Sequence, residues 1–246
     1  DYKIFENNIL KMKEFITNNK VKLRPHAKMH KSIDVANFQI NNGGAHGICC
    51  QKVSEAEVFF RNGIKDILIT NQVTDLLKID RLTKIDTKNC NISCCVDNEE
   101  NIINIQNSAF ENNSIINVYI EYDCGANRCG LESFKEIQSL IDLINTMSNI
   151  KFEGFQAYNG SIQHIEDFAQ RKINVQETCN KIRSLKTRFK DYSPIITGVG
   201  TGCFDLEVKE NVYDEIQVGS YAFMDAHYSS LKKDSKVNNT INFKNA

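Results

Sequence analysis

Short apolar runs alternate with longer amphipathic segments along most of this 246-residue chain. The apolar runs are typical of buried strands, and eight are expected, at residues 21–27, 46–50, 66–70, 91–97, 115–123, 151–158, 194–199 and 214–223. The other segments have helical spacing, at residues 2–19, 32–41, 54–62, 74–85, 99–110, 131–147, 165–190 and 204–209. This alternation predicts parallel strands, because each intervening helix returns the chain to the same end of the sheet.

Eight such units favour a (β/α)8 barrel of the TIM type, because a closed barrel leaves no unpaired strand edge. A doubly wound open sheet is the alternative, since a strand count made from sequence can be wrong by about one or two. Helix boundaries are also indicated locally. Ser54 and Glu57 have the spacing of a capping box, and Asn62-Gly63 predicts the end of the same helix.

Composition and charge exclude several classes of protein. A formal net charge of -1 gives no field that would gather nucleic acid or anionic lipid. No apolar run approaches the ~20 residues of a membrane span. The nine cysteines include the pairs Cys49-Cys50 and Cys94-Cys95 but no Cys-x-x-Cys spacing, so they predict reduced thiols in a cytoplasmic protein and no zinc site.

Candidate chemistry gathers in residues 23–31, which hold two histidines, an arginine and two lysines at the end of the first expected strand. Burial of Lys28 would lower the pKa of its amine, and a neutral amine is the form that attacks an aldehyde. A lysine directed to solvent is the alternative. The turns at 198–202 and at Gly219-Ser220 offer backbone N–H groups and hydroxyls suited to a phosphate, although glycine turns alone are weak indications.

Six motifs in register carry a resemblance that covers almost the whole chain. The chain resembles the D-threonine aldolase and D-serine dehydratase family, pyridoxal-phosphate enzymes of the alanine racemase fold type that include 3-hydroxy-D-aspartate aldolases. The motifs are Arg24-Pro25-His26-Ala27-Lys28-x-His30-Lys31, Cys49-Cys50-Gln51-Lys52-Val53-Ser54-Glu55-Ala56-Glu57, Asp123-x-Gly125-x-Asn127-Arg128-x-Gly130, Gln156-Ala157-Tyr158-x-Gly160-Ser161-x-Gln163-His164, Thr197-Gly198-x-Gly200-Thr201-Gly202 and Gln217-Val218-Gly219-Ser220-Tyr221-x-Phe223-Met224-Asp225.

The resemblance implies roles for the residues around the reacting groups. Lys28 would be the lysine that holds pyridoxal 5'-phosphate as a Schiff base, and Arg128 would contact the phenolic oxygen of that cofactor. Tyr158 would lie beside the ring. His164 would lie near the substrate hydroxyl as a candidate base, with a histidine that caps the following helix as the alternative.

The resemblance also assigns the rest of the cofactor site. The phosphate would be held by Gly200, Thr201, Gly219 and Ser220. Gln217 falls where alanine racemases place an arginine against the ring nitrogen, and a neutral partner there is expected to leave the pyridine less firmly protonated.

The implied function is a lyase that cleaves a β-hydroxy-D-amino acid, D-threonine or 3-hydroxy-D-aspartate, to glycine and an aldehyde. Two alternatives remain open. A D-serine dehydratase would use the same lysine to form pyruvate and ammonia, and a protein of this fold could instead bind pyridoxal phosphate without turnover. His164 would serve as base in the aldolase or as acid in the dehydratase.

The chain differs from the family in its extent. We expect residues 1–228 to form the cofactor-binding barrel and residues 229–246 to lead to a C-terminal β domain that is missing, so the chain is expected to be a fragment. That domain carries the family's divalent-metal ligands (for Mn, Mg or Zn) and completes the neighbouring subunit's site, so no metal ligand is assigned here and a homodimer is implied. Met29 is expected in the core, whereas His26 and His30 would point inward with Lys28 by strand alternation.

Overall fold

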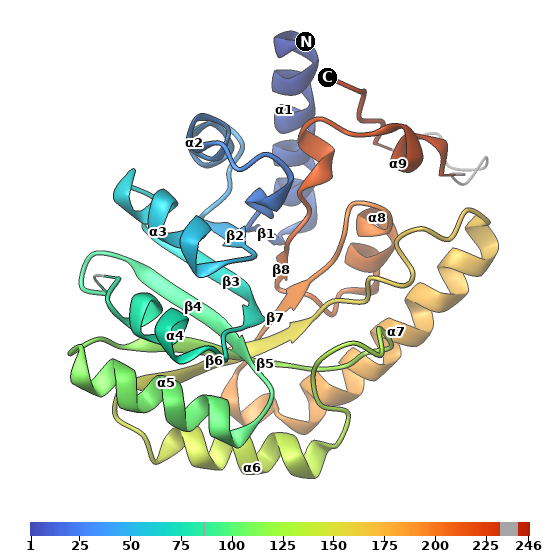
Figure 1. Ribbon diagram of the computed structural model, residues 1–246. Coiled ribbons are helices and arrows are strands. Elements are labelled where there is room, and N and C mark those ends of the chain that lie inside the picture. Colours follow the sequence, from blue (N-terminus) through green and yellow to red (C-terminus); the bar gives the residue numbers. More distant parts are fainter. Residues whose placement is uncertain (86, 232–240) are drawn as a thin grey trace.

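The computed structural model describes residues 1–85, 87–231 and 241–246, and its centre is one sheet of eight parallel strands (Figure 1). The strand order is β1-β8-β7-β6-β5-β4-β3-β2. Their bounds are β1 Lys22–Leu23, β2 Ile48–Cys50, β3 Asp66–Gln72, β4 Asn91–Val96, β5 Ile116–Glu121, β6 Ile150–Ala157, β7 Ile195–Gly198 and β8 Glu215–Ile216. The predicted set of eight parallel strands is therefore confirmed.

Backbone hydrogen bonds join the two ends of this strand order and close the sheet. His46 N donates to Leu23 O at 3.1 Å, and Cys49 N donates to Pro25 O at 2.9 Å. His26 and Cys49 form a parallel bridge at the same junction. The sheet is thus a barrel of the predicted (β/α)8 type, and the open, doubly wound alternative is wrong.

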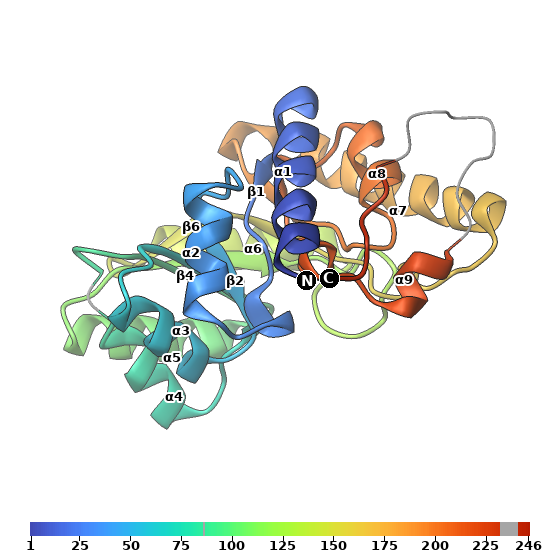
Figure 2. The ribbon, with the colours of Figure 1, turned by 90° about the horizontal axis from the view of Figure 1, so that it is seen from above.

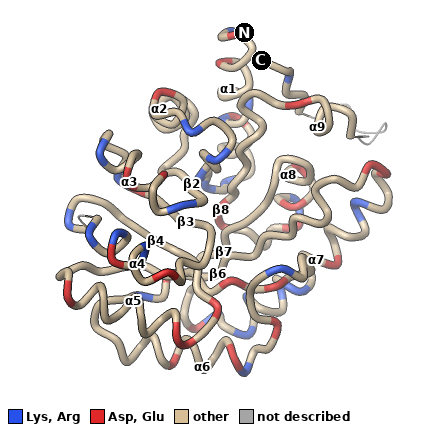
Figure 3. The backbone as a smooth tube through the Cα atoms, in the orientation of Figure 1, with Lys and Arg blue, Asp and Glu red and all other residues tan. Residues whose placement is uncertain are grey.

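Helices lie around the sheet (Figures 1 and 2), and α1 to α8 each bury residues, whereas α9 buries none. Within the described part of the chain their bounds are α1 Tyr2–Asn19, α2 Ile33–Asn41, α3 Val53–Arg61, α4 Leu76–Thr83, α5 Glu99–Glu111, α6 Phe134–Asn145, α7 Phe168–Arg188, α8 Phe204–Glu207 and α9 Ala226–Ser230. Short 3-10 helices lie at η1 Ala27–Met29, η2 Lys190–Tyr192, η3 Val208–Glu210 and η4 Ser220–Ala222. Positively and negatively charged residues alternate along the outer helices and loops (Figure 3). None of the described helices combines the length and the hydropathy of a membrane span.

The first and last strands end earlier than predicted, and this correction positions the functional residues. β1 stops before Pro25, which has no N–H for a strand ladder, and the chain then turns into η1. β8 gives way to η4 after Gly219, whose backbone lies so close to η1 that an added Cβ would stand 2.6 Å from His26 O. Both 3-10 helices therefore lie at the carboxyl end of the barrel, side by side.

The start of α3 also differs from the prediction. The capping box expected at Ser54 and Glu57 is wrong, because α3 begins one residue earlier and its N-cap, Lys52, makes no side-chain capping bond. The carboxylate of Glu55 instead accepts a hydrogen bond from Gln51 N at 2.9 Å. This contact satisfies a backbone donor that precedes the helix.

The carboxyl end of the chain packs beside α1 (Figure 2). Lys244 N donates to Asn8 Oδ1 at 3.1 Å, and Asn8 Nδ2 donates to Lys244 O at 2.8 Å. Phe243 is buried against the barrel. Of the segment expected to be a polar linker, residues 232–240 lie outside the described residues, and the described end, 241–246, contacts the helix layer.

A buried cluster of ions fills the barrel near the amino-terminal ends of β3 and β8. Arg24 Nε donates to Glu215 Oε2 at 3.0 Å, and Arg24 Nη1 contacts Asp66. His46 Nε2 lies 2.8 Å from the same Glu215 oxygen. Burial alone would raise the pKa of Glu215, but Arg24 and His46 lower it to about 2, so the carboxyl group is ionised.

Removal of the cation from this cluster tests its contribution to stability. Arg24→Met should reduce the free energy of unfolding by about 3–5 kcal/mol, because it leaves the buried Glu215 carboxylate without its main partner. Urea unfolding at neutral pH measures the loss. Arg61→Met, at an exposed position of α3, is the matched control and should change stability by less than about 0.5 kcal/mol. Equal effects of the two substitutions would contradict the assignment.

Candidate active site

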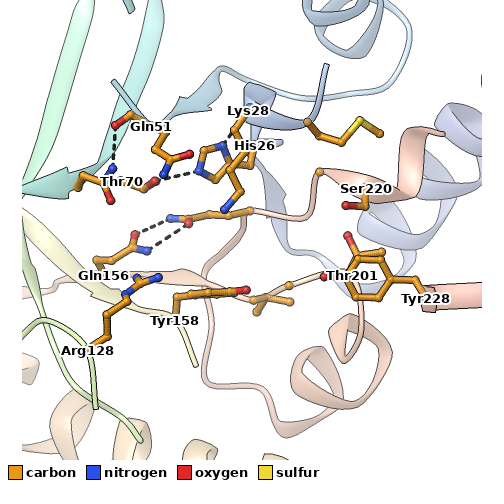
Figure 4. Close-up of a pocket in the computed structure, with 16 residues that line it drawn as sticks. His26, Lys28, Gln51, Thr70, Arg128, Gln156, Tyr158, Thr201, Ser220 and Tyr228 are labelled. Atoms are coloured by element: carbon orange, nitrogen blue, oxygen red, sulfur yellow. Dashed lines mark hydrogen bonds between the residues drawn. The ribbon is translucent and has the colours of Figure 1, made fainter. Parts of the chain in front are cut away.

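A pocket opens at the carboxyl ends of the strands, and sixteen residues line it (Figure 4). Eight of the nine residues proposed from the sequence are among them. These are Lys28, Arg128, Tyr158, Gly200, Thr201, Gln217, Gly219 and Ser220. The remaining residue, His164, does not line the pocket. Strand ends that are far apart in the sequence thus converge on one cavity, as the barrel geometry requires.

Lys28 lies on η1 and points its side chain into the pocket (Figure 4). The turn places it beside residues that follow β2 and β8. Partial burial and then the positive charge of Arg128 lower the pKa of the amine below its ordinary value. A larger share of neutral amine is therefore available near neutral pH, which favours attack on a carbonyl group.

His26 is a buried, neutral support for the turn that carries Lys28. Its Nδ1 accepts a hydrogen bond from Lys28 N at 3.3 Å, and its Nε2 lies 3.0 Å from Thr70 Oγ1. Because Thr70 Oγ1 donates to Cys50 O at 3.2 Å, it accepts from His26, and the imidazole carries its proton on Nε2. Burial, Lys28 and His30 together lower the pKa of His26 to about 3.

Arg128 is held by a buried carboxylate that the sequence reasoning did not identify. Arg128 Nη2 donates to Glu121 Oε1 at 3.3 Å, and Gln72 Nε2 donates to Glu121 Oε2 at 2.6 Å. The guanidinium carbon lies 5.8 Å from the centre of the Tyr158 ring. Burial raises the pKa of Glu121, although Gln72 and Arg128 oppose that effect. The position of Glu121 at the end of a strand was the available signal.

Two glycine turns form the opposite wall, and buried polar side chains support one of them. Gly202 N donates to Gln163 Oε1 at 3.0 Å, while Gln163 Nε2 donates to Glu207 Oε2 at 3.2 Å. An added Cβ at Gly200 would lie 2.4 Å from Gln163 Oε1, so a larger residue there would displace the Gln163 side chain. Burial, together with the nearby charge of Asp205, raises the pKa of Glu207 to about 7, although its hydrogen bonds from neutral donors oppose that effect. The hydroxyls of Thr201 and Ser220 border the same part of the pocket.

Two amides form the floor of the pocket. Gln217 Nε2 donates to Gln156 Oε1 at 2.7 Å and to Thr197 Oγ1 at 2.8 Å. Gln156 Nε2 donates back to Gln217 Oε1 at 3.3 Å. Gln156 belongs to a motif noted in the sequence, but no role had been assigned to it. This contact reaches across β7, which lies between β6 and β8, and it cannot be recognised from sequence spacing.

His164 lies outside the pocket and reaches it only through Tyr228. Its ring stacks on Tyr228 at 5.2 Å between centroids, and the His227 ring lies 4.8 Å away. Tyr228 itself lines the pocket. The role of His164 as acid or base therefore stays a prediction, and in this structure Tyr228 lies between it and the cavity.

Strand alternation predicts that His26 and His30 both point into the pocket with Lys28, but only His26 does so. His26 and Met29 line the pocket, but His30 does not, and its Nδ1 accepts from Ser32 N at 3.0 Å. The expectation for His30 is wrong because η1 replaces the extended strand. Met29 packs against the core and also borders the pocket.

Several further residues of the pocket have no role predicted from the sequence. Besides Gln156 and Tyr228, these are Gln51, Thr70, Asn71 and Val199. Among the described residues, no group of three or more His, Cys, Asp or Glu side chains is arranged to hold a metal ion. No disulfide joins any of the nine cysteines, and every one except Cys129 is buried.

The chain is similar in sequence to a known protein family and to several of its members. Residues 1–227 match the family model of the alanine racemase N-terminal domain. The chain is 37% identical over 234 residues to a 3-hydroxy-D-aspartate aldolase of Paracoccus denitrificans (strain Pd 1222), a match that covers 94% of this chain and 60% of that protein. It is 35% identical over 236 residues to a D-threonine aldolase of Arthrobacter sp, with coverage of 95% and 62%.

A solved structure gives the same result. The crystal structure of D-threonine aldolase from Filomicrobium marinum superposes with a TM-score of 0.94 and 32% identity, covering 100% of this chain and 66% of that one. The chain thus spans 60% to 62% of the length of the curated relatives named above.

The buried environment of His26 predicts a histidine that does not titrate in the ordinary range. Its imidazole should remain neutral, with the proton on Nε2, from pH 8 down to about pH 4, since its pKa is lowered to about 3. Long-range proton–nitrogen NMR of the imidazoles measures both the charge and the tautomer, and His26→Gln assigns the signal. A His26 titration midpoint between about pH 6 and 7 would contradict this environment.

Proposed function

Because the chain belongs to the alanine racemase N-terminal domain family, we propose that its pocket binds pyridoxal 5'-phosphate and that the whole protein is a lyase. The proposed reaction cleaves a β-hydroxy-D-amino acid, D-threonine or 3-hydroxy-D-aspartate, to glycine and an aldehyde. The observation that carries the proposal is the convergence of eight expected residues on one pocket. The two aldolases that match nearly the whole chain support the choice of reaction.

The side chains of the pocket fit the polar groups of this cofactor. The hydroxyls of Thr201 and Ser220 and the tight turn at Gly200 suit a phosphate. The guanidinium of Arg128 suits an anionic phenolic oxygen. The amine of Lys28 suits the aldehyde, because its lowered pKa favours the neutral form.

Pyridoxal phosphate supplies an electron-withdrawing ring that stabilises negative charge left on the α-carbon of a bound amino acid. The residues of the pocket hold and orient the groups that contact the cofactor. His26 fixes the backbone of the Lys28 turn without adding a charge beside the amine. Glu121 keeps the guanidinium of Arg128 in place above the Tyr158 ring.

Cleavage of the bond between the α- and β-carbons requires a base that accepts the proton of the β-hydroxyl. We propose His164 for this role, acting from the edge of the pocket beside Tyr228. A displacement of the Tyr228 ring would give the imidazole access. In the dehydratase alternative the same group would donate a proton to the departing hydroxyl.

The remaining proposals concern the whole protein. Residues 1–228 would form the cofactor-binding barrel, and residues 229–246 would lead to a C-terminal β domain that carries a divalent metal (Mn, Mg or Zn) near the substrate hydroxyl. The shorter span of this chain relative to the named aldolases supports that division. We also propose a homodimer and a cytoplasmic location, the latter supported by nine cysteines among which no disulfide forms.

Covalent trapping tests the assignment of the amine. Borohydride reduction of the whole protein with pyridoxal phosphate should label residue 28 and no other lysine. Lys28→Ala should remove the label and the visible absorbance, and turnover should fall by more than about 10³-fold, as for loss of other covalent groups. Lys31→Ala is the matched control, because that lysine is exposed and pairs with Glu55. A label retained in Lys28→Ala and lost in Lys31→Ala would transfer the role to the other amine.

Product analysis separates the proposed reaction from its alternatives. With D-threonine or 3-hydroxy-D-aspartate, the whole protein should release glycine and an aldehyde in equal amounts. Pyruvate and ammonia from D-serine, without glycine from the other substrates, would favour the dehydratase. Bound cofactor with no product from any of the three amino acids would favour a binding protein.

A further inference from the structure

A chain of hydrogen bonds runs from the floor of the pocket into the barrel. Gln217 Nε2 donates to Thr197 Oγ1 at 2.8 Å, and Thr197 Oγ1 donates to Glu215 Oε1 at 2.6 Å. Glu215 belongs in turn to the ion cluster with Arg24. The relative exposures of Gln217, Thr197 and Glu215 are 5%, 0% and 1%, so water does not compete for these bonds.

The direction of each bond follows from the charge of Glu215. Its other oxygen, Oε2, receives Arg24 Nε at 3.0 Å and lies 2.8 Å from His46 Nε2, so the carboxyl group is ionised and can only accept. Thr197 has one hydroxyl proton, which it gives to Glu215. The Thr197 oxygen can then only accept from Gln217, which must present its NH₂ group to Thr197.

The second proton on Gln217 Nε2 is used as well, in the bond to Gln156 Oε1 at 2.7 Å. Both donor positions of this amide are therefore occupied within the barrel. The group that Gln217 retains for a ligand is its carbonyl oxygen, which receives only the longer 3.3 Å bond from Gln156 Nε2. Rotation of the amide by half a turn would place two acceptor oxygens, from Gln217 and Thr197, against each other.

We propose that Glu215, acting through Thr197, is a positioning residue that presents the carbonyl oxygen of Gln217 to the pocket as a hydrogen-bond acceptor, and that a pyridine nitrogen bound to it carries a proton. This inference rests on the proposed function. The phosphate, the aldehyde and the phenolic oxygen of pyridoxal phosphate match the glycine turns, Lys28 and Arg128. The ring nitrogen is the polar group left for the amides.

This result differs from the expectation that a neutral residue at position 217 would leave the pyridine less firmly protonated. The expectation follows from the neutral charge of the Gln217 side chain, whereas the proposal follows from the direction in which its amide faces. An amide that faces a ring nitrogen through its oxygen stabilises the pyridinium form, whereas one that faces it through its NH₂ group stabilises the unprotonated form. The buried carboxylate of Glu215 thus determines which protonation state of the ring nitrogen the Gln217 amide stabilises.

The test uses the whole protein reconstituted with pyridoxal phosphate that is ¹⁵N-labelled in the ring, and the ¹⁵N chemical shift reports the protonation of the ring nitrogen. Wild type should give the pyridinium shift at neutral pH. Thr197→Val removes the hydroxyl and keeps the side-chain shape, so the amide is no longer oriented. The pKa of the bound ring nitrogen should then fall by about one unit, the size of a single lost hydrogen bond.

Two further variants keep the test decisive even if Thr197→Val fails to fold. Thr197→Ser retains the hydroxyl and should keep the wild-type shift. Gln217→Leu removes the acceptor and should lower the pKa of the ring nitrogen at least as far as Thr197→Val. An unprotonated ring nitrogen in wild type, or a pyridinium shift unchanged in Gln217→Leu, would overturn the inference.

The outcomes separate this inference from the function on which it rests. If wild type binds no pyridoxal phosphate, or if residue 28 is not labelled, the proposed function fails and the inference fails with it. If the cofactor is bound through Lys28 but the ring nitrogen does not respond to these substitutions, only the inference fails.

Discussion

The hydrogen bonds that close the barrel between β1 and β2 are the constraint on which the site depends. They hold the segment after β1 against β2 on one side, through the bridge between His26 and Cys49. On the other side, Gly219 lies so near that an added Cβ would stand 2.6 Å from His26 O. The turn that carries Lys28 is thus held between two neighbouring strand ends. Without this closure, the turn that carries Lys28 and the pocket residue Gln51, which follows β2, would lie at opposite edges of an open sheet.

The barrel interior is polar at both ends, but the two ends differ in ionisation. Near the amino ends of the strands, Arg24 and His46 lower the pKa of Glu215 to about 2, so the charge is compensated. Beside the pocket, Glu207 has only neutral donors, and its pKa rises to about 7. His26 is buried beside Lys28 and His30, and its pKa falls to about 3. A buried side chain is therefore charged or neutral according to the charge of the groups it contacts.

Much of the site could be predicted because the fold brings all carboxyl strand ends to one face. Any polar residue that follows a strand was a reasonable candidate, and eight of nine were placed in one pocket by that rule and the resemblance. The rule failed where the backbone is neither strand nor regular helix. The 3-10 turn after β1 turned His30 away from the pocket, and α9 placed Tyr228 between His164 and the cavity. Glu121 was missed because its partner, Gln72, comes from a different strand.

Hydrophobic periodicity was enough to predict the eight strands, their order along the chain and the helices α1 to α8, since it is a property of neighbouring residues. The 3-10 turns and α9 were not predicted, because they do not follow a regular apolar repeat. Which side chains meet, which of them are charged and which way an amide faces all depend on contacts between distant segments. Arg24 and Glu215, whose opposite charges stabilise each other, are 191 positions apart. The hydrogen-bonded amides Gln156 and Gln217 are 61 positions apart. Their chemistry depends on mutual burial, which exists only once the barrel has closed.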